Sequence, residues 1–325
     1  MLKLFKLVLL VAAGFGVWYF LTHFRVLGLG SIKVESRTDP PGGGGAPKPS
    51  FAPFASQGTK LAIRLGAANF APLDAAKLAR QHVVGRIVQI ARQFDVLAVQ
   101  GIQARDQNVL VQLVEQTNAG GRHYDFAVAP QVGREPVKQY NAFVFDSDSV
   151  EIDRRTVAWV DNRAGQFEQP PLVAAFRAKG PPAAEAFTFT LVNVQTSSER
   201  TAEELALLAK VFRAVRDDGR NEDDVILLGT LGADEEHLGP LGLLPNLLSA
   251  ISGTPTTTRG TRLADNILFD RRATAEYTHR SGVVDLMRQF NLTLREAGEI
   301  AEHLPVWAEF SVYEGGQAGH VAAGP

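Results

Sequence analysis

The sequence predicts an α+β protein that folds as a four-layer α/β sandwich, in which two packed mixed β-sheets are flanked by helices. Strands and single-faced amphipathic helices alternate near both ends of the folded region, whereas five strands follow one another in its middle. The short connections between these middle strands favour one sheet packed on another. They fit a doubly wound parallel sheet less well.

Composition sets the first limits. The chain has 325 residues, of which 45% are hydrophobic, enough for one large domain or two small ones. Its net charge of -2 argues against a general polyanion binder, although a local basic patch is compatible with it. Because there is no cysteine, disulfides, thiolate metal sites and cysteine nucleophiles are excluded.

The N-terminal segment, residues 1–25, is predicted to be a transmembrane anchor. The stretch Leu7–Leu21 is uncharged and mostly apolar, with lysines before it and Arg25 after it. A cleaved signal peptide is the main alternative and a buried helix a weaker one, but the residues after the apolar stretch make a poor cleavage site. We therefore expect a single-pass membrane protein and leave open on which side the folded domain lies.

The domain boundaries follow from composition. Residues 26–59 are rich in proline and glycine and predict a disordered linker, because such a segment buries too little apolar surface to order itself. Residues 60–313 carry the folded domain, and residues 314–325 are predicted to form a disordered tail.

The expected elements follow from apolar periodicity. In order they are a strand at Leu61–Ala68, a helix at Asp74–Phe94, a strand at Asp95–Gln100, a helix at Gln107–Asn118, strands at Tyr124–Ala129, Ala142–Phe145, Val150–Val160, Leu172–Phe176 and Phe187–Val194, a helix at Thr201–Val215, a strand from Val225, a loop or short helix at Gly239–Ile251, a strand at Asn266–Phe269, helices at Asp285–Phe290 and Leu294–Ile300, and a strand at Pro305–Val312. Thr201 and Glu204 have the spacing of a capping box.

Six segments in this order resemble the strand-end motifs of the endonuclease/exonuclease/phosphatase superfamily, which has the deoxyribonuclease I-like fold. The segments are Ile63–Phe70, Asp95–Ile102, Phe189–Thr196, Val225–Ala233, Ala264–Ile267 and Ala301–Val306. They resemble, respectively, the family's first strand ending in asparagine and its patterns DIVALQEI, FTLINVHT, VILLGDFNA, YDRI or YDNI, and SDHLPV. The set spans most of residues 61 to 312.

The resemblance implies a Mg²⁺-dependent hydrolase of phosphodiesters or phosphomonoesters. In that family a glutamate is the main metal ligand, and a histidine oriented by an aspartate handles the proton of the attacking water. The aspartate and asparagine of the GDFN motif position the nucleophile and bind metal or phosphate. The histidine of NVHT stabilises negative charge in the transition state.

This chain departs from that pattern at several positions. Gly101 stands at the expected metal ligand, Gln195 at the NVHT histidine, and Thr230 and Gly232 at the GDFN aspartate and asparagine. Glu302 replaces the aspartate before the histidine. The residues that remain are Asn69, Asp265 and His303, which are expected as vestigial site residues or as structural strand-end residues.

We therefore predict a divergent member with a degraded active site, inactive and serving for binding or as a scaffold. It would have no cofactor if inactive and Mg²⁺ if active. The alternative is a divalent-metal-dependent phosphodiesterase, nuclease or phosphatase with relocated ligands such as Asp234, Glu235 or Glu236. Expected partners are a membrane through the N-terminal helix and an unidentified phosphoester or protein. Nucleic acid is compatible with the fold but is not supported by the overall charge.

Overall fold

The computed structural model describes residues 34–36, 61–105, 107–128, 138–220 and 222–316. The predicted anchor, residues 1–25, lies outside the described residues. Most of the predicted linker and of the predicted tail does so too. Within the described ranges, no helix is long and apolar enough to cross a membrane.

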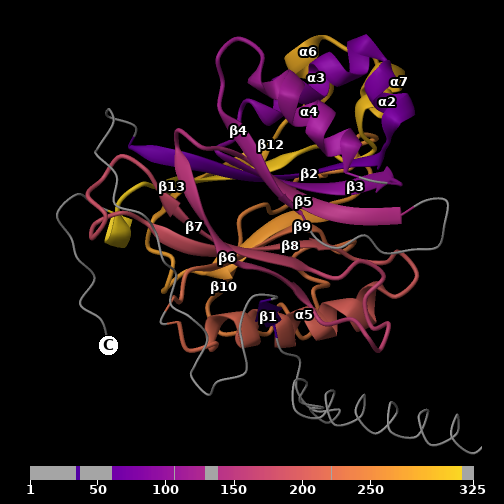
Figure 1. The fold of residues 1–325 in the computed structure, drawn as a ribbon. Coiled ribbons are helices and arrows are strands. Elements are labelled where there is room, and N and C mark those ends of the chain that lie inside the picture. The colour runs from indigo at the N-terminus through magenta and orange to yellow at the C-terminus, as the bar shows by residue number, and fades with distance from the viewer. Residues whose placement is uncertain (1–33, 37–60, 106, 129–137, 221, 317–325) are drawn as a thin grey trace, which may run out of the picture.

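The described chain forms two mixed sheets packed face to face, with helices on both outer faces (Figure 1). The first sheet has seven strands, and the only parallel pair in it is β8 with β9. In sheet order these strands are β1 (Val34–Ser36), β6 (Val150–Val160), β7 (Leu172–Ala178), β8 (Thr188–Gln195), β9 (Val225–Thr230), β11 (Asp265–Asp270) and β10 (Leu247–Ser249).

The second sheet has six strands, and β2 with β3 is its parallel pair. In sheet order these strands are β12 (Tyr277–Val283), β13 (Val306–Ser311), β2 (Ala62–Leu73), β3 (Val96–Ala104), β5 (Lys138–Asp146) and β4 (Tyr124–Val128). The predicted sandwich of two mixed sheets is confirmed.

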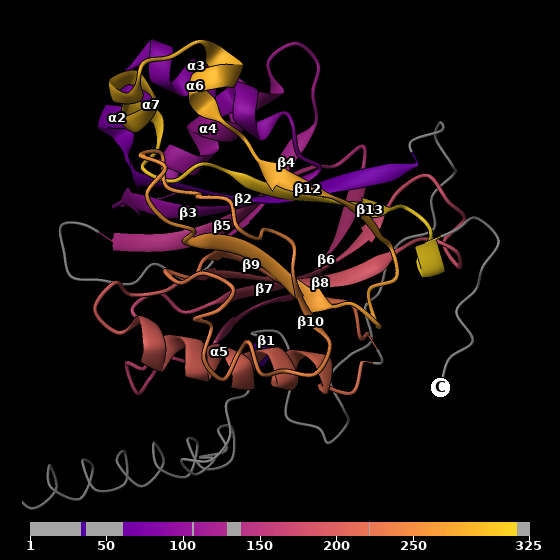
Figure 2. The ribbon, with the colours of Figure 1, turned by 180° about the vertical axis from the view of Figure 1, so that it is seen from behind.

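Helices cover the two outer faces unequally, as both ribbon views show (Figures 1 and 2). The helix α5 (Thr201–Arg216) lies alone along the seven-stranded sheet. The other described α-helices lie over the six-stranded sheet, and they are α2 (Ala75–Ala79), α3 (Gln81–Ala91), α4 (Asn108–Asn118), α6 (Leu286–Phe290) and α7 (Leu294–Ile300). A short 3₁₀ helix, η1 (Glu314–Gly316), follows β13 at the opposite end of the sheets from α2 and α7.

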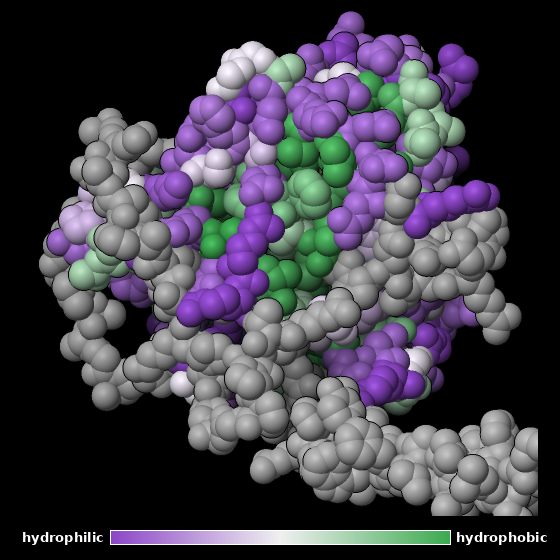
Figure 3. Space-filling view, viewed as in Figure 1, coloured by the Kyte–Doolittle hydropathy of each residue, from purple (hydrophilic) through white to green (hydrophobic). Residues whose placement is uncertain are grey.

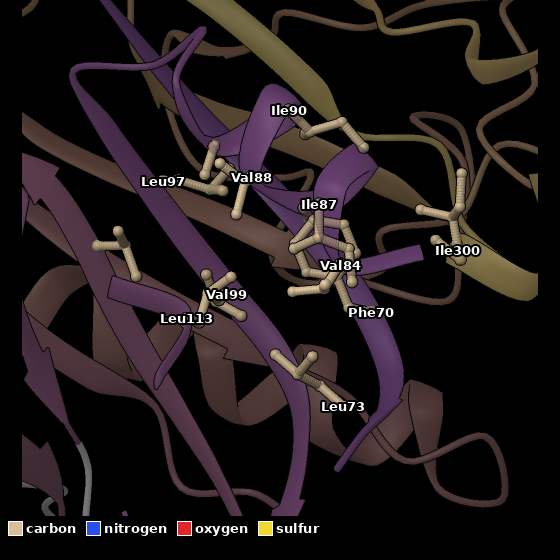
Figure 4. Close-up of a cluster of buried hydrophobic side chains, with 14 of the residues drawn as sticks. Phe70, Leu73, Val84, Ile87, Val88, Ile90, Leu97, Val99, Leu113 and Ile300 are labelled. Carbon is tan, nitrogen blue, oxygen red and sulfur yellow. The ribbon is translucent and has the colours of Figure 1, made fainter. Parts of the chain in front are cut away.

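Three apolar clusters hold these layers together. The cluster between the sheets is rich in phenylalanine, and Phe176, Phe189 and Phe310 are all 0% exposed in it. Figure 4 shows the cluster beneath the upper helices, where Val84 and Ile87 of α3 pack toward Phe70 and Val99 of the sheet. Burial of apolar surface stabilises a fold by roughly 25 cal/mol per Å². The clusters therefore hold the two sheets together and fix the strand ends at their edges.

Several predicted elements differ from the observed ones. The helix expected at Asp74–Phe94 is divided at Arg80, whose extended backbone separates α2 from α3. Lys77 of α2 is buried and reaches the Phe70 and Ile300 carbonyls. The strand β2 continues beyond Ala68 to Leu73, and its pairing with β3 shifts register after Asn69. The strand β12 was not predicted, since its residues are half-exposed and show no apolar alternation.

The expected capping box at Thr201 and Glu204 is wrong. Arg200 is the N-cap of α5 and makes no side-chain cap bond, whereas the buried Glu204 accepts hydrogen bonds from the Ser197 and Glu168 amides. A capping box forms instead at α7, between Thr293 and Glu296.

Parts of the segments predicted as linker and tail are ordered. Within residues 26–59, Val34–Ser36 pair with β6 as an edge strand, because β6 offers a free row of backbone groups there. Within residues 314–325, Glu314–Gly316 form η1 against β13.

Figure 3 shows the face where β4 and β6 lie next to each other, on which apolar residues gather among polar ones.

Candidate functional site

Asn69, Asp265 and His303 lie far apart in sequence but meet at one edge of the sandwich. The Asn69 Nδ2 group donates to the Thr230 hydroxyl at 3.1 Å, and that hydroxyl donates to Asp265 Oδ1 at 2.7 Å. His303 Nδ1 lies 2.7 Å from Asp265 Oδ2. The structure therefore brings together the three residues that match the family's active-site motifs. Thr230, which stands at the position of the GDFN aspartate, links Asn69 to Asp265. Their catalytic role stays a prediction.

Thr256 completes this network, and sequence reasoning did not find it. Its hydroxyl donates to Asp265 Oδ2 at 2.8 Å and accepts from the backbone amides of Ala264 and Asp265. Both Asp265 oxygens are consequently occupied by hydrogen-bond donors in a site where Asp265 is only 3% exposed. The sequence signal would have been the run of threonines before β11.

His303 is oriented by Asp265. A carboxylate can only accept, so His303 Nδ1 carries the donated proton and Nε2 is left for other partners. Burial lowers the pKa of His303, but the hydrogen bond to Asp265 and its negative charge outweigh that effect and raise the pKa above its ordinary value. Glu302, which stands at the family's aspartate before the histidine, is exposed, and the structure gives it no side-chain bond to His303.

Position 101, where a metal-binding glutamate is expected, is closed to side chains. Gly101 has φ +76, in the left-handed region that favours glycine. A Cβ atom there would lie 2.5 Å from the Ala71 amide nitrogen and 2.6 Å from Asn69 Oδ1. The Gly101 amide donates to Gln195 Oε1 at 3.1 Å, so two of the replaced positions are bonded to each other.

A cavity of about 750 Å³ opens beside His303. It lies between the loop that precedes β11 and the helix α7, and it contains three exposed arginines, Arg259, Arg262 and Arg295. Within the described residues, none of the three forms an ion pair. Its acidic residues are Glu299, which pairs with Arg80 and His82, and Glu302. The cavity wall is therefore predominantly cationic.

A buried lysine, also missed by sequence reasoning, lies behind this edge. Lys77 is 4% exposed, and its Nζ donates to the Phe70 carbonyl at 2.7 Å and the Ile300 carbonyl at 3.1 Å. Burial, assisted by the nearby charge of Arg80, lowers the pKa of Lys77 to about 8. Lys77 ties the end of β2 to the end of α7, and it lines a second, smaller cavity next to the first.

The chain is similar to animal deoxyribonucleases along most of its length. It is 28% identical to deoxyribonuclease-1-like 1 of Cricetulus griseus over 79% of this chain and 86% of the relative. It is 23% identical to deoxyribonuclease gamma of Rattus norvegicus over 76% and 84%. No protein-family model matches the chain.

Solved structures of low sequence identity share the fold. TDP2 of D. rerio, in complex with a single-stranded DNA product, superposes with a TM-score of 0.55 at 13% identity, covering 77% of this chain and 98% of that one. The human Nocturnin catalytic domain with bound sulfate gives 0.52 at 15% identity, covering 78% and 95%. The chain therefore has the deoxyribonuclease I-like fold of the endonuclease/exonuclease/phosphatase superfamily and is similar in sequence to deoxyribonucleases.

Members of this superfamily generally use a divalent metal such as Mg²⁺. The residues of this chain do not fit such an ion at the expected place. Gly101 offers no ligand, Thr230 offers a hydroxyl already shared between Asn69 and Asp265, and Asp265 has both oxygens occupied. Mg²⁺ prefers carboxylates and near-octahedral geometry, for which one engaged carboxylate is a poor substitute.

The relocated ligands expected for an active superfamily enzyme are not assembled either. Asp234 Oδ1 is bonded to His237 Nδ1 at 2.5 Å, and Glu235 Oε1 accepts from the Ser252 hydroxyl at 2.6 Å. Among the described residues, the groups of three acidic or histidine side chains close enough to share an ion both contain Asp224, and neither contains Asp265 or Glu235. At Gly232, an added Cβ atom would lie 3.2 Å from the hydroxyl oxygens of Thr196 and Thr201.

Proposed function

We propose that this chain is a non-catalytic member of the superfamily that binds a phosphate ester in the arginine-lined cavity beside His303. DNA is the first ligand to test, because the relatives with the cited similarity are named deoxyribonucleases. The observation that carries the proposal is the closure of position 101 against Ala71 and Asn69.

Loss of catalysis is supported by how the replaced positions are used. Gln195 bonds the Gly101 amide, and Thr230 joins Asn69 to Asp265. These bonds make a static network where a superfamily enzyme needs a metal and a charged hydrogen-bond donor. Removing members of such a cooperating set lowers a rate by orders of magnitude.

Phosphoester binding is supported by the cavity wall. Arg259, Arg262 and Arg295 are exposed and unpaired within the described residues, and arginine recognises phosphate oxygens through two parallel hydrogen bonds. His303 adds a donor at the cavity floor, and its pKa is raised by Asp265. A local basic wall of this kind is compatible with a chain whose net charge is -2.

A hydrolase is the second candidate, favoured by one observation. His303 and Asp265 keep a 2.7 Å contact that suits a general base and its orienting carboxylate. A phosphodiesterase assay on single-stranded DNA and on a chromogenic diester, with Mg²⁺ or Mn²⁺ added, separates the candidates. We expect no turnover above buffer. Turnover that disappears in His303→Ala would refute the non-catalytic proposal.

Binding is tested with a fluorescent single-stranded oligonucleotide in the presence of EDTA, followed by polarisation. We expect the change of Arg259 and Arg262 to glutamine to weaken binding by about tenfold or more, with a shallower dependence on salt. The change of both Arg271 and Arg272 to glutamine is the matched control, because it removes two other exposed arginines, which lie just beyond the far end of β11. Equal losses in both variants would refute the assignment of the cavity.

The N-terminal anchor is part of the same proposal. Its support is the sequence alone, namely the uncharged stretch Leu7–Leu21 between basic residues. Expression of the full chain followed by carbonate extraction of membranes is expected to leave the protein in the pellet, and deletion of residues 1–25 to release it. Release of the full chain by carbonate would exclude an anchor.

A further inference from the structure

A cluster of carboxylates lies at the other end of the strand that carries Thr230. Asp224 directly precedes β9, Glu276 precedes β12, and Glu314 follows β13. One oxygen from each lies within 4.8 Å of the others. The six residues of β9 place this cluster roughly 20 Å from Thr230, given the rise of a strand, so it is separate from the cavity.

The carboxylates are buried without positive partners. Asp224 and Glu276 are each 2% exposed, and Glu314 is half-buried. In the part of the chain that the structure describes, no lysine or arginine pairs with any of the three. Their hydrogen bonds to backbone are few: Glu276 Oε1 accepts from the Gly315 amide at 2.6 Å, and Glu314 Oε2 accepts from the Thr188 amide at 3.2 Å. Burying unpaired charge in this way is costly.

A second observation, independent of the acidic residues, concerns Thr274. This residue, on the turn between β11 and β12, is 2% exposed, and its hydroxyl lies near the Asp224 carboxyl without a well-formed hydrogen bond to any group. Asp224 Oδ1 and Glu276 Oε2 are buried without partners as well. Folded proteins leave few buried polar atoms unsatisfied, so three oxygens orphaned at one point indicate a missing ligand.

We propose that Asp224, Glu276 and Glu314, with the Thr274 hydroxyl, bind a calcium ion. The ion would join the start of β9 in the seven-stranded sheet to the segments that flank β12 and β13 in the six-stranded sheet. It would therefore act as a structural clamp between the two sheets, at the end remote from the cavity.

The donor set selects the kind of cation. Every candidate ligand is an oxygen, and Glu222 and Asp223 form a second group with Asp224 within the same 4.8 Å. Ca²⁺ accepts six to eight oxygens in flexible geometry, whereas Mg²⁺ demands an octahedron and keeps several waters. A buried set of carboxylates contributed by several separate segments therefore suits Ca²⁺. The rival occupant is a proton shared among the carboxyls, since burial raises the pKa of Glu276 to about 7.

The test uses the full chain, freed of metal with EDTA and then re-equilibrated with millimolar CaCl₂. Bound calcium is measured by mass spectrometry of the metal after desalting, and stability by thermal unfolding. We expect one calcium ion per chain and a rise of the unfolding midpoint by about 5–10 °C once calcium exceeds its dissociation constant about 100-fold. Both effects should disappear in Glu276→Gln and persist in Glu236→Gln, a matched change at an exposed carboxylate.

Two further variants keep the proposal open to refutation. Thr274→Val removes one neutral ligand and should weaken calcium binding measurably even if Glu276→Gln fails to fold. Asp265→Asn should leave the calcium content unchanged, because it alters the cavity end only. Absence of calcium from the wild-type chain would overturn the proposal in favour of shared protons. If calcium were lost in Asp265→Asn but kept in Glu276→Gln or Thr274→Val, the ion would bind at the cavity end of β9. That result would also overturn the proposal.

Discussion

The carboxylates near the two ends of β9 differ in how well their oxygens are satisfied by hydrogen bonds. At the Thr230 end, Gly101, Gln195 and Thr230 stand where the superfamily motifs carry a glutamate, a histidine and an aspartate, and Asp265 has donors on both oxygens. At the Asp224 end, several carboxyls crowd together and buried oxygens stay without partners. The comparison teaches that the two ends differ in how far their buried polar atoms are satisfied by hydrogen bonds, a difference that the family motifs do not predict.

The difference between the two ends of β9 is tested most directly by changing one aspartate to asparagine at each end. In EDTA, Asp265→Asn is expected to destabilise the fold by about 2–3 kcal/mol, because a buried carboxylate that accepts from Thr230, Thr256 and His303 is lost. Asp224→Asn is expected to be neutral or stabilising there, since it removes buried charge that lacks a partner. Urea unfolding measures both, and similar costs in the two variants would contradict the contrast.

Closure of position 101 is tested with alanine. Gly101→Ala is expected to cost about 2–3 kcal/mol, because it combines a left-handed backbone with Cβ contacts under 3 Å. Gly120→Ala is the matched control: its φ of +83 imposes similar strain, but no atom lies within 4 Å of the added Cβ. We expect about 1 kcal/mol for that variant. Equal costs by urea unfolding would mean that the site has room for a side chain.

The cavity wall depends on the start of α7. Thr293→Ala removes the capping box and is expected to cost about 1 kcal/mol, while loosening the helix that carries Arg295. Oligonucleotide affinity should fall together with stability. In Thr201→Ala, where the sequence predicts a box that the structure does not form, affinity should not change. If affinity fell in Thr201→Ala but not in Thr293→Ala, oligonucleotide binding would not depend on α7.

The smallest expected effect is the pH dependence of the His303–Asp265 pair. Because Asp265 raises the folded pKa of His303 above its ordinary value, the pair adds stability that is fully present below that ordinary value and is lost as pH rises through the folded pKa. NMR titration of the histidines should show this raised pKa. It should drop in Asp265→Asn, and an unchanged pKa would show that Asp265 does not govern the ring.

Sequence reasoning identified residues at strand ends that the structure brings together, and their role as a functional site stays a prediction. Asn69, Asp265 and His303 are brought together as expected, and Gly101, Gln195, Thr230 and Gly232 occupy the places that the motifs assign. Strand-end motifs are predictable because a short buried strand delivers the residue after it to the edge of a sheet. The cavity arginines were missed, because their meeting depends on how α7 packs against the loop before β11.

The sequence by itself determined the sandwich, the buried strand β9 and the loss of side chains expected for catalysis, because apolar periodicity and local motifs are written into consecutive residues. Tertiary structure decided the rest. Whether position 101 has room depends on Ala71 across the edge of the sheet, and the orphaned oxygens of Asp224 and Glu276 belong to separate segments. Burial and hydrogen-bond satisfaction are properties of neighbours in space, so they exist only once the sheets have packed.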